Sequence, residues 1–227
     1  MQHDQPNSVG AAAEEPRLGL AAALRLELRH HLPFTVAVTV VTAVAASAAV
    51  RAWPGIAASH LSFEGAHLTH VFVSAIATTA VASRQRAGVA LAAGLGIVGS
   101  IGFCTLSDVV LPYAGALLFR VPVSLDVELL DAPLKVVLAA VVGAAGGFVH
   151  MRRLSVYSHS AHVLVSSLAS VLYVHTHADG SWLDWGHAPA MAAVLFVSVF
   201  LPCCMSDLVM PVSCTHCDFR GREDATP

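Results

Sequence analysis

The sequence predicts an all-α membrane protein with about six transmembrane helices, arranged as two inverted repeats of three helices each. Three observations predict this class. The 227-residue chain is 56% hydrophobic and only 12% charged, with a mean hydropathy of +0.70, whereas soluble domains carry about 25% charged residues. Its long apolar runs follow one another like successive membrane spans. Its two halves also carry the same polar motif in the same order.

The apolar runs indicate where the helices lie. A membrane-spanning helix needs about 20 mostly apolar residues. We therefore expect six spans, at residues 33–53, 66–83, 88–119, 132–150, 159–177 and 188–213. The third run is too long for one straight helix. It contains Gly94, Gly96, Gly99, Gly102 and Pro112. We therefore expect the third helix of each repeat to be broken.

These runs also indicate the domain organisation. Residues 1–32 are expected to form a disordered N-terminus and a short interfacial helix. Residues 33–120 form the first repeat, residues 121–213 the second, inverted repeat, and residues 214–227 a cytoplasmic tail rich in Cys and His. The first 20 residues lack the apolar core of a cleavable signal peptide, so the first span is expected to act as its own targeting signal.

Basic residues predict the orientation of the chain. With the N-terminus in the cytoplasm, nine of the twelve Lys and Arg residues fall on the inner side. These are Arg17, Arg25, Arg29, Arg84, Arg86, Arg152, Arg153, Arg220 and Arg222. This positive-inside distribution predicts that both termini are cytoplasmic. Because three spans is an odd number, the second repeat then crosses the membrane in the opposite sense to the first.

The duplicated motif reads H-x-x-H followed by C-x-x-S-D-x-x-x-P. In the first half its residues are His67, His70, Cys104, Ser107, Asp108 and Pro112. In the second half they are His159, His162, Cys203, Ser206, Asp207 and Pro211. Chance alignment of small apolar residues would not repeat so many polar positions in one order, so we infer an internal duplication. Inverted repeats place their substrate site near the membrane midplane, at the interface between the repeats.

Asp108 and Asp207 are the residues that a membrane interior tolerates least. An Asp at the centre of a span costs about 2.5–3.5 kcal/mol on insertion, so it is expected to face the interior and to have a partner. Lys135 is one candidate partner, but one lysine cannot neutralise two carboxylates, which favours a bound cation. Pro112 and Pro211 lie four residues after these Asp residues and lack the N–H that would bond the Asp carbonyl. They predict helix breaks with a free carbonyl, or alternatively plain kinks.

The histidines and cysteines of the motif indicate the kind of cation. In each repeat the Cys and the Asp are four residues apart and the two His are three apart, so each pair shares a helix face. Imidazole nitrogens suit Zn, Fe, Ni or Cu, and thiolates favour the softer of these metals. We expect His70 and His162 to be ligands, and His67 and His159 to lie at the mouth of the site.

Two further groups of metal-ligating residues lie outside the motif. The expected last outer loop contains His175, His177, Asp179, Asp184 and His187, which could capture cations weakly. The tail contains Cys214, His216 and Cys217. These are three ligands where a closed zinc site needs four, so a metal-delivery patch and an inert tail are both left open.

Three segments resemble a prokaryotic membrane family named for manganese transport and for heavy-metal or arsenic export. They are GSIGFCTLSDVVLPY at Gly99–Tyr113, SHSAHVLVSSLASVLY at Ser158–Tyr173 and LPCCMSDLVMP at Leu201–Pro211. The resemblance covers most of residues 33–212. It implies a permease for a metal or metalloid ion in a bacterial cytoplasmic membrane. Members of that family are often longer than this chain, so a homodimer is an alternative to a pathway within one chain.

The expected function is therefore secondary transport of a divalent transition-metal ion or a metalloid, with export as the expected direction. The sequence has no nucleotide-binding motif, so we expect an ion gradient to drive transport, with a proton as the candidate coupling ion. We expect no catalysis, no resident cofactor and no nucleic-acid partner, only the bilayer and the transported ion. One alternative is a membrane metalloenzyme that uses the H-x-x-H pairs, although no H-E-x-x-H is present. A membrane sensor that signals through the tail is another.

Overall fold

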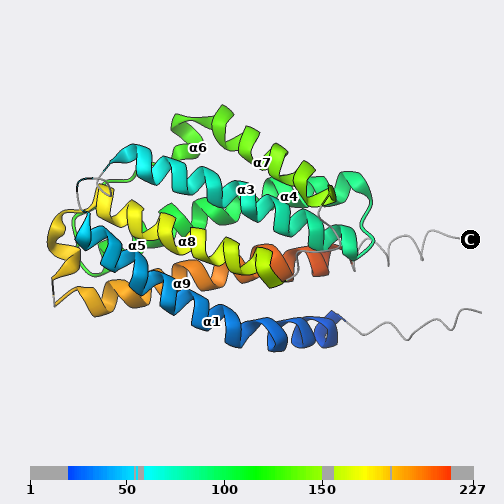
Figure 1. The fold of residues 1–227 in the computed structure, drawn as a ribbon, viewed down its shortest axis with the longest axis horizontal. Helices are drawn as coiled ribbons and strands as arrows, with labels where there is room; N and C mark the ends of the chain where they lie inside the picture. The colour runs from blue at the N-terminus through cyan, green and yellow to red at the C-terminus, as the bar shows by residue number, and fades with distance from the viewer. Residues whose placement is uncertain (1–19, 54, 56–58, 150–155, 185, 216–227) are drawn as a thin grey trace, which may run out of the picture.

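The computed structural model describes residues 20–53, 55, 59–149, 156–184 and 186–215, and it is a bundle of helices (Figure 1). Six long helical segments of the described chain run alternately in opposite directions along the bundle. They are α1 (Leu20–Ala52), α3 (His60–Arg84), α4 with its continuation (Val89–Leu118), α7 (Pro133–Val149), α8 (Val156–His177) and α9 with its continuation (Ala188–Thr215). The start of α1, in blue, and the end of the α9 segment, in red, lie at the same end of the bundle (Figure 1).

The described chain forms no β-strand, and short elements close the other end of the bundle. These are α6 (Glu128–Asp131) and the 3₁₀ turn η2 (Gly180–Leu183). An isolated antiparallel bridge joins Val123 to Ala178. It ties the loop before α6 to the end of α8. The prediction of an all-α protein is confirmed.

Three helices are long and apolar enough to cross a membrane, counted over the described residues. They are His60–Arg84, Val89–Leu118 and Ala188–Thr215. Two further apolar helical stretches, Val36–Ala52 and Pro133–Val149, are shorter than the three candidate spans. These lengths and compositions are those of a membrane protein, and the count of six spans stays a prediction.

The distribution of polarity is the reverse of that in a soluble protein. Large apolar side chains face outward at high exposure, with Val98 73%, Leu118 75% and Leu134 78% exposed. Polar and titratable side chains instead fill the interior. The buried ones include His67, His70, Ser74, Thr78, Ser107, Asp108, Glu128, His162, Ser166, Ser170, Ser206 and Asp207. A soluble monomer rarely exposes apolar surface of this extent. Lipid is the solvent in which an apolar exterior and a polar interior are both stable.

Glycines let α3 lie at the centre of the bundle, where it packs against α4, α7 and α8. Gly143 and Gly147 of α7 form a G-x-x-x-G stripe against α3. A Cβ atom on Gly147 would lie 2.7 Å from Thr79 Cβ and 2.8 Å from the Ile76 carbonyl oxygen, and one on Gly143 would collide with the Phe72 carbonyl oxygen. Small residues at this spacing allow two membrane helices to approach closely. The sequence analysis did not single out this stripe.

The first helices differ from the expected boundaries. A single helix α1 runs through Pro33, where an interfacial helix followed by a separate span was expected. A proline removes one backbone hydrogen bond but need not end a membrane helix. Helix α3 begins at His60 rather than at residue 66, because Ser59 caps it by accepting a hydrogen bond from the Ser62 N–H at 3.2 Å. Glu64, in the first turns of α3, is paired, because the Lys135 ammonium donates to its carboxylate. Lys135 is therefore not the partner of either buried Asp.

The third helix of each half is continuous, so the expected breaks at Pro112 and Pro211 are wrong. Instead, each helix contains one π-helical turn, η1 (Leu106–Val110) or η3 (Met205–Val209). The Leu111 N–H donates to the Leu106 carbonyl, and the Met210 N–H donates to the Met205 carbonyl, each five residues back. Such π turns are rare and often lie at functional sites. Both turns contain the Asp of the motif.

The π turns also explain how the helices continue past the prolines. Because donors in a π turn reach back five residues, the proline leaves the carbonyl of the motif Ser without a backbone donor. A hydroxyl from the other half of the chain replaces the missing N–H. Ser170 Oγ donates to the Ser107 carbonyl at 3.1 Å, and Thr78 Oγ1 donates to the Ser206 carbonyl at 3.3 Å. These carbonyls are therefore satisfied within the protein and are not free for an ion.

Candidate metal site

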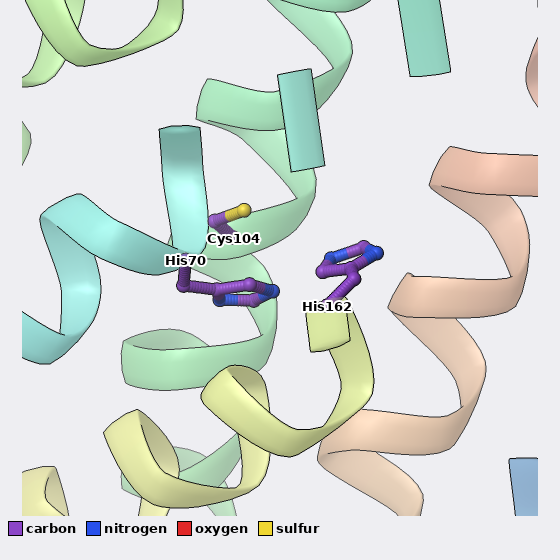
Figure 2. Close-up of side chains that lie close together, drawn as sticks. All are labelled: His70, Cys104 and His162. Atoms are coloured by element: carbon purple, nitrogen blue, oxygen red, sulfur yellow. The ribbon is translucent and has the colours of Figure 1, made fainter. Parts of the chain in front are cut away.

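Three buried side chains from three helices point toward one another in the middle of the bundle (Figure 2). They are His70 of α3, Cys104 of α4 and His162 of α8. Each offers one ligand atom, and these atoms all lie within 4.8 Å of one another. The two imidazole ring centroids are 4.7 Å apart, and the ring planes are tilted by 37°. A single transition-metal ion bound at 2.0–2.3 Å from each ligand would fit this separation after small side-chain movements.

Each imidazole is held by the Asp of its own half. His70 Nδ1 donates to Asp108 Oδ2 at 2.7 Å, and His162 Nδ1 donates to Asp207 Oδ2 at 2.6 Å. An ionised carboxylate only accepts hydrogen bonds, so Nδ1 carries the proton and Nε2 carries the lone pair. Carboxylates orient metal-binding histidines in this way in many proteins. We therefore assign both Asp residues to positioning the rings, whereas the sequence analysis treated them as ligands.

His67 shares the carboxylate of Asp108. Its Nδ1 donates to Asp108 Oδ2 at 2.9 Å. The Nε2 atoms of both His67 and His70 are buried and have no hydrogen-bond partner among the described residues. A buried polar atom without a partner lowers the stability of the fold by about 1–3 kcal/mol. Nitrogen lone pairs kept at this cost are typical of ligands that await an ion. The side chain of His159, the counterpart of His67, lies outside the described part of the chain.

The second cysteine of the motif lies beside the same imidazoles. Cys203 is 1% exposed and interacts electrostatically with both His70 and His162. It carries a free thiol, as does Cys104. Two imidazoles and the Cys104 thiol thus form the group that could hold an ion, and the Cys203 thiol interacts with both imidazoles. This donor set suits soft or borderline metals such as Zn²⁺ better than Mn²⁺, which prefers oxygen ligands.

Hydroxyl groups connect the two halves around the site. Thr78 Oγ1 donates to Asp207 Oδ1 at 3.5 Å, and Ser166 Oγ donates to Asp108 Oδ1 at the same distance. Ser107 Oγ also donates to Asp108 Oδ1, at 2.9 Å. The Ser74 hydroxyl lies 3.2 Å from that of Ser206. Helix α3 of the first half thus bonds to η3 of the second, and α8 of the second half bonds to η1 of the first.

The motif read from the sequence does not include the hydroxyls of Ser74, Thr78, Ser166 and Ser170, although a signal for them exists. The pairs His70 and His162, Ser74 and Ser166, and Thr78 and Ser170 are all separated by the same 92 residues. Extending the repeat alignment beyond the H-x-x-H pairs would have included these hydroxyls.

The structure thus brings together nine of the predicted site residues, with Pro112 and Pro211 one turn away. The nine are His67, His70, Cys104, Ser107, Asp108, His162, Cys203, Ser206 and Asp207. The expected cation group in the last outer loop is not assembled among the described side chains. His177 bonds to Asp126, Asp179 caps η2, and His175 packs edge-on against Trp182. His216 and Cys217 of the tail lie outside the described residues.

Fold and site together define a helical membrane-type protein with a buried His and Cys group that could hold a metal ion. No family model, no curated protein and no solved structure matches the chain. The resemblance to the manganese and heavy-metal family therefore stays a prediction from the quoted segments. The function is therefore inferred from the residues of the site.

Proposed function

We propose that the protein is a secondary transporter of a divalent transition-metal ion and that the ion binds between the two halves of the bundle. The observation that carries the proposal is the convergence of His70, Cys104 and His162, with their ligand atoms within 4.8 Å. The nitrogen and sulfur donors favour an ion of the Zn²⁺ class. Intramembrane ionisable residues that face a bundle interior mark ion pathways in many transporters.

The proposal includes six spans and an inverted relation between the halves. The positive-inside distribution of basic residues supports cytoplasmic termini. The start of α1 and the end of the α9 segment also lie at the same end of the bundle (Figure 1). The matched hydrogen bonds of the halves support a duplicated origin, because each π turn accepts a hydroxyl from the opposite half. Sites in inverted-repeat transporters lie at such an interface.

In this mechanism both halves supply ligands to the site. Asp108 and Asp207 bond to Nδ1 of His70 and His162, so Nε2 of each ring is the nitrogen that would bind the ion. Cys104 adds a thiol, and Cys203 lies close enough to join. Because the donors come from both halves, a movement of one half against the other would change the geometry of the site and its access to either side of the membrane. Direction and coupling ion are left to experiment.

The metalloenzyme alternative has less support from the geometry. It requires both His of an H-x-x-H pair to hold one catalytic metal, as paired helical histidines do in many hydrolases. The group that could hold an ion instead takes His70 from one half and His162 from the other, and His67 is not one of its members. A symmetric arrangement suits passage of an ion better than directional chemistry.

Zn²⁺ flux in proteoliposomes containing a zinc-sensitive dye tests the proposal. We expect the purified protein to conduct Zn²⁺, and we expect His70→Ala and His162→Ala each to remove most of this flux. His175→Ala is the matched control, because this His also lies on α8 but bonds to no group of the site. Flux at the parental rate in both site variants would exclude this path for the ion.

A further inference from the structure

A second group of metal-ligating side chains lies at the end of the bundle remote from the described chain ends. His60 begins α3, His177 ends α8, and Asp126 lies in the loop between α5 (Leu111–Leu118) and α6. Asp126 Oδ2 lies 3.0 Å from His60 Nε2 and 3.1 Å from His177 Nε2. The ligand atoms of the three residues lie within 4.8 Å of one another. No motif in the sequence connects them.

The backbone fixes this group in place. The Ser124 N–H donates to the His177 carbonyl at 3.1 Å, and the Tyr173 hydroxyl donates to the Ser124 carbonyl at 3.1 Å. The Asp179 N–H donates to the Pro122 carbonyl at 3.2 Å. The loop that carries Asp126 is therefore attached to the end of α8 on both sides of the bridge between residues 123 and 178. The meeting of the three side chains follows from the fold rather than from a chance encounter of mobile surface residues.

The hydrogen bonding of His177 indicates a missing cation. Its Nδ1 lies 2.9 Å from the Tyr173 carbonyl oxygen, which can only accept, so Nδ1 carries the proton. A neutral ring then points the Nε2 lone pair at the Asp126 carboxylate, 3.1 Å away, and the two electron-rich atoms repel each other. A positive charge between or on these groups removes the repulsion. A metal ion that binds both atoms is one such charge, and a second proton on the ring is the other.

A buried carboxylate adds a fourth candidate ligand. Glu128 is 2% exposed, and its Oε2 has no hydrogen-bond partner among the described residues although it lies 3.8 Å from His60 Nε2. Burial and the neighbouring Glu64 carboxylate raise the pKa of Glu128. The group therefore contains two carboxylates and two imidazoles, and the nearest ammonium, that of Lys135, already bonds to Glu64. A divalent cation would balance the charge of the two carboxylates and would give the unpartnered Glu128 oxygen a ligand contact.

Glu128 also faces the inner site. It interacts electrostatically with His67 as well as with His60, and His67 donates to Asp108 beside His70. The ring of Phe63 stacks on that of His67 at a centroid distance of 5.8 Å and packs edge-on against His177. Glu128 and His67 therefore lie between the surface group and the buried site in the sequence of these interactions.

We propose that His60, His177, Asp126 and Glu128 form a second site for a divalent transition-metal ion, at one end of the path to the inner site. Two nitrogen and two oxygen donors suit Zn²⁺ or Co²⁺. The role on the path rests on the proposed transport function, whereas the binding itself does not. This outer site contains no thiol, while the inner site contains that of Cys104. Cobalt therefore distinguishes them, because only a Co²⁺ ion bound by thiolate gives an intense near-ultraviolet charge-transfer band.

Titration of the purified full-length protein with Co²⁺ tests this inference. We expect two equivalents to bind, one with the thiolate band and one with visible d–d bands alone. The variant H70A/C104S/H162A should lose the first and keep the second. In this background, His177→Ala and Asp126→Asn should each weaken the remaining equivalent by at least about 10-fold, since even the loss of an outer-shell partner weakens metal binding by about 10–100-fold. Asp179→Asn and His175→Ala, from the same end of the bundle, should leave it unchanged.

His60→Ala protects the test against misfolding, because this side chain is 51% exposed. In the otherwise wild-type protein it should weaken the outer equivalent and leave the thiolate band intact. If the H70A/C104S/H162A variant binds no Co²⁺, or if it binds equally well after His177→Ala and Asp126→Asn, the outer site does not exist. If the parent protein bound Co²⁺ without a thiolate band, this result would contradict the proposed inner site but not the outer one.

Discussion

Replacing Asp108 by Asn tests whether this carboxylate holds the metal ligands in place. Its Oδ2 accepts the Nδ1–H groups of His67 and His70 at 2.9 and 2.7 Å, and its Oδ1 accepts the Ser107 hydroxyl at 2.9 Å. Asn has the same shape but no charge and only one acceptor oxygen. If that oxygen stays with the two imidazoles, the new NH₂ group faces Ser107, whose hydroxyl can rotate to accept. The substitution thus removes the charge and preserves the packing.

The size of the effect follows from the two imidazole bonds. A hydrogen bond to a charged group contributes about 1.5–3 kcal/mol and a neutral one about 0.5–1.5 kcal/mol. Each bond is thus weakened by about 1 kcal/mol, and both together by about 2 kcal/mol. Since 1.4 kcal/mol is a factor of ten, Zn²⁺ should bind about 30-fold more weakly. This value lies within the 10–100-fold range found when the outer-shell partners of metal ligands are removed.

Competition with a chelating dye on the purified full-length protein measures this affinity, and proteoliposome flux measures its consequence for transport. We expect Asp108→Asn to insert normally and to lose most Zn²⁺ flux, with Asp207→Asn behaving alike through His162. Asp179→Asn is the control, because this carboxylate accepts from Ser181 at the outer end of the bundle. Parental affinity in Asp108→Asn would refute the positioning role. A loss above about 1,000-fold, or about 4 kcal/mol, would show instead that Asp108 coordinates the ion directly.

Three further changes probe the fold around the site. Gly147→Ala should destabilise the protein by about 1–3 kcal/mol, because the new Cβ overpacks against α3. The control is Gly146→Ala, whose new Cβ would lie 3.4 Å from its nearest neighbour. The melting temperature in detergent should be lower for Gly147→Ala than for Gly146→Ala. Ser170→Ala should reduce the free energy of unfolding by about 1–3 kcal/mol, because the Ser107 carbonyl in η1 would be left buried without this donor; an unchanged melting temperature would contradict the role assigned to this hydroxyl. Single cysteines introduced into a cysteine-free protein should react with an impermeant reagent from outside at Ser124 but not at Gln85, and the opposite pattern would overturn the six-span orientation.

The sequence alone predicted the class of the protein and the residues of its inner site. Low charge and long apolar runs indicate a lipid environment, because a helix that faces lipid must be apolar along its whole length. The duplicated motif located the polar residues, since a buried Asp or His in such a run requires an internal partner. These inferences depend on local composition and spacing, which a sequence displays directly.

The structure alone determined which atoms meet. Spacing placed His70 and Asp108 on interior faces, but the relative rotation of α3 and η1 made Nδ1 the bonded atom and left Nε2 for a ligand. Likewise, Lys135 bonds to Glu64 rather than to a motif Asp because α7 and α3 pack side by side. The register between two helices depends on how their side chains interlock over many residues, and no short motif encodes it.

The π turns and the outer site depend most strongly on tertiary contacts. Pro112 predicted a break from local chemistry, but Ser170 donates to the carbonyl of Ser107, 63 residues before it in the chain, which the proline leaves without a backbone donor. The helix therefore continues with one wider turn. His60, Asp126 and His177 share no motif and come from three separate segments. They meet only because the loop before α6 bonds to the end of α8. Such contacts are decided by packing between distant segments, which local sequence patterns do not record.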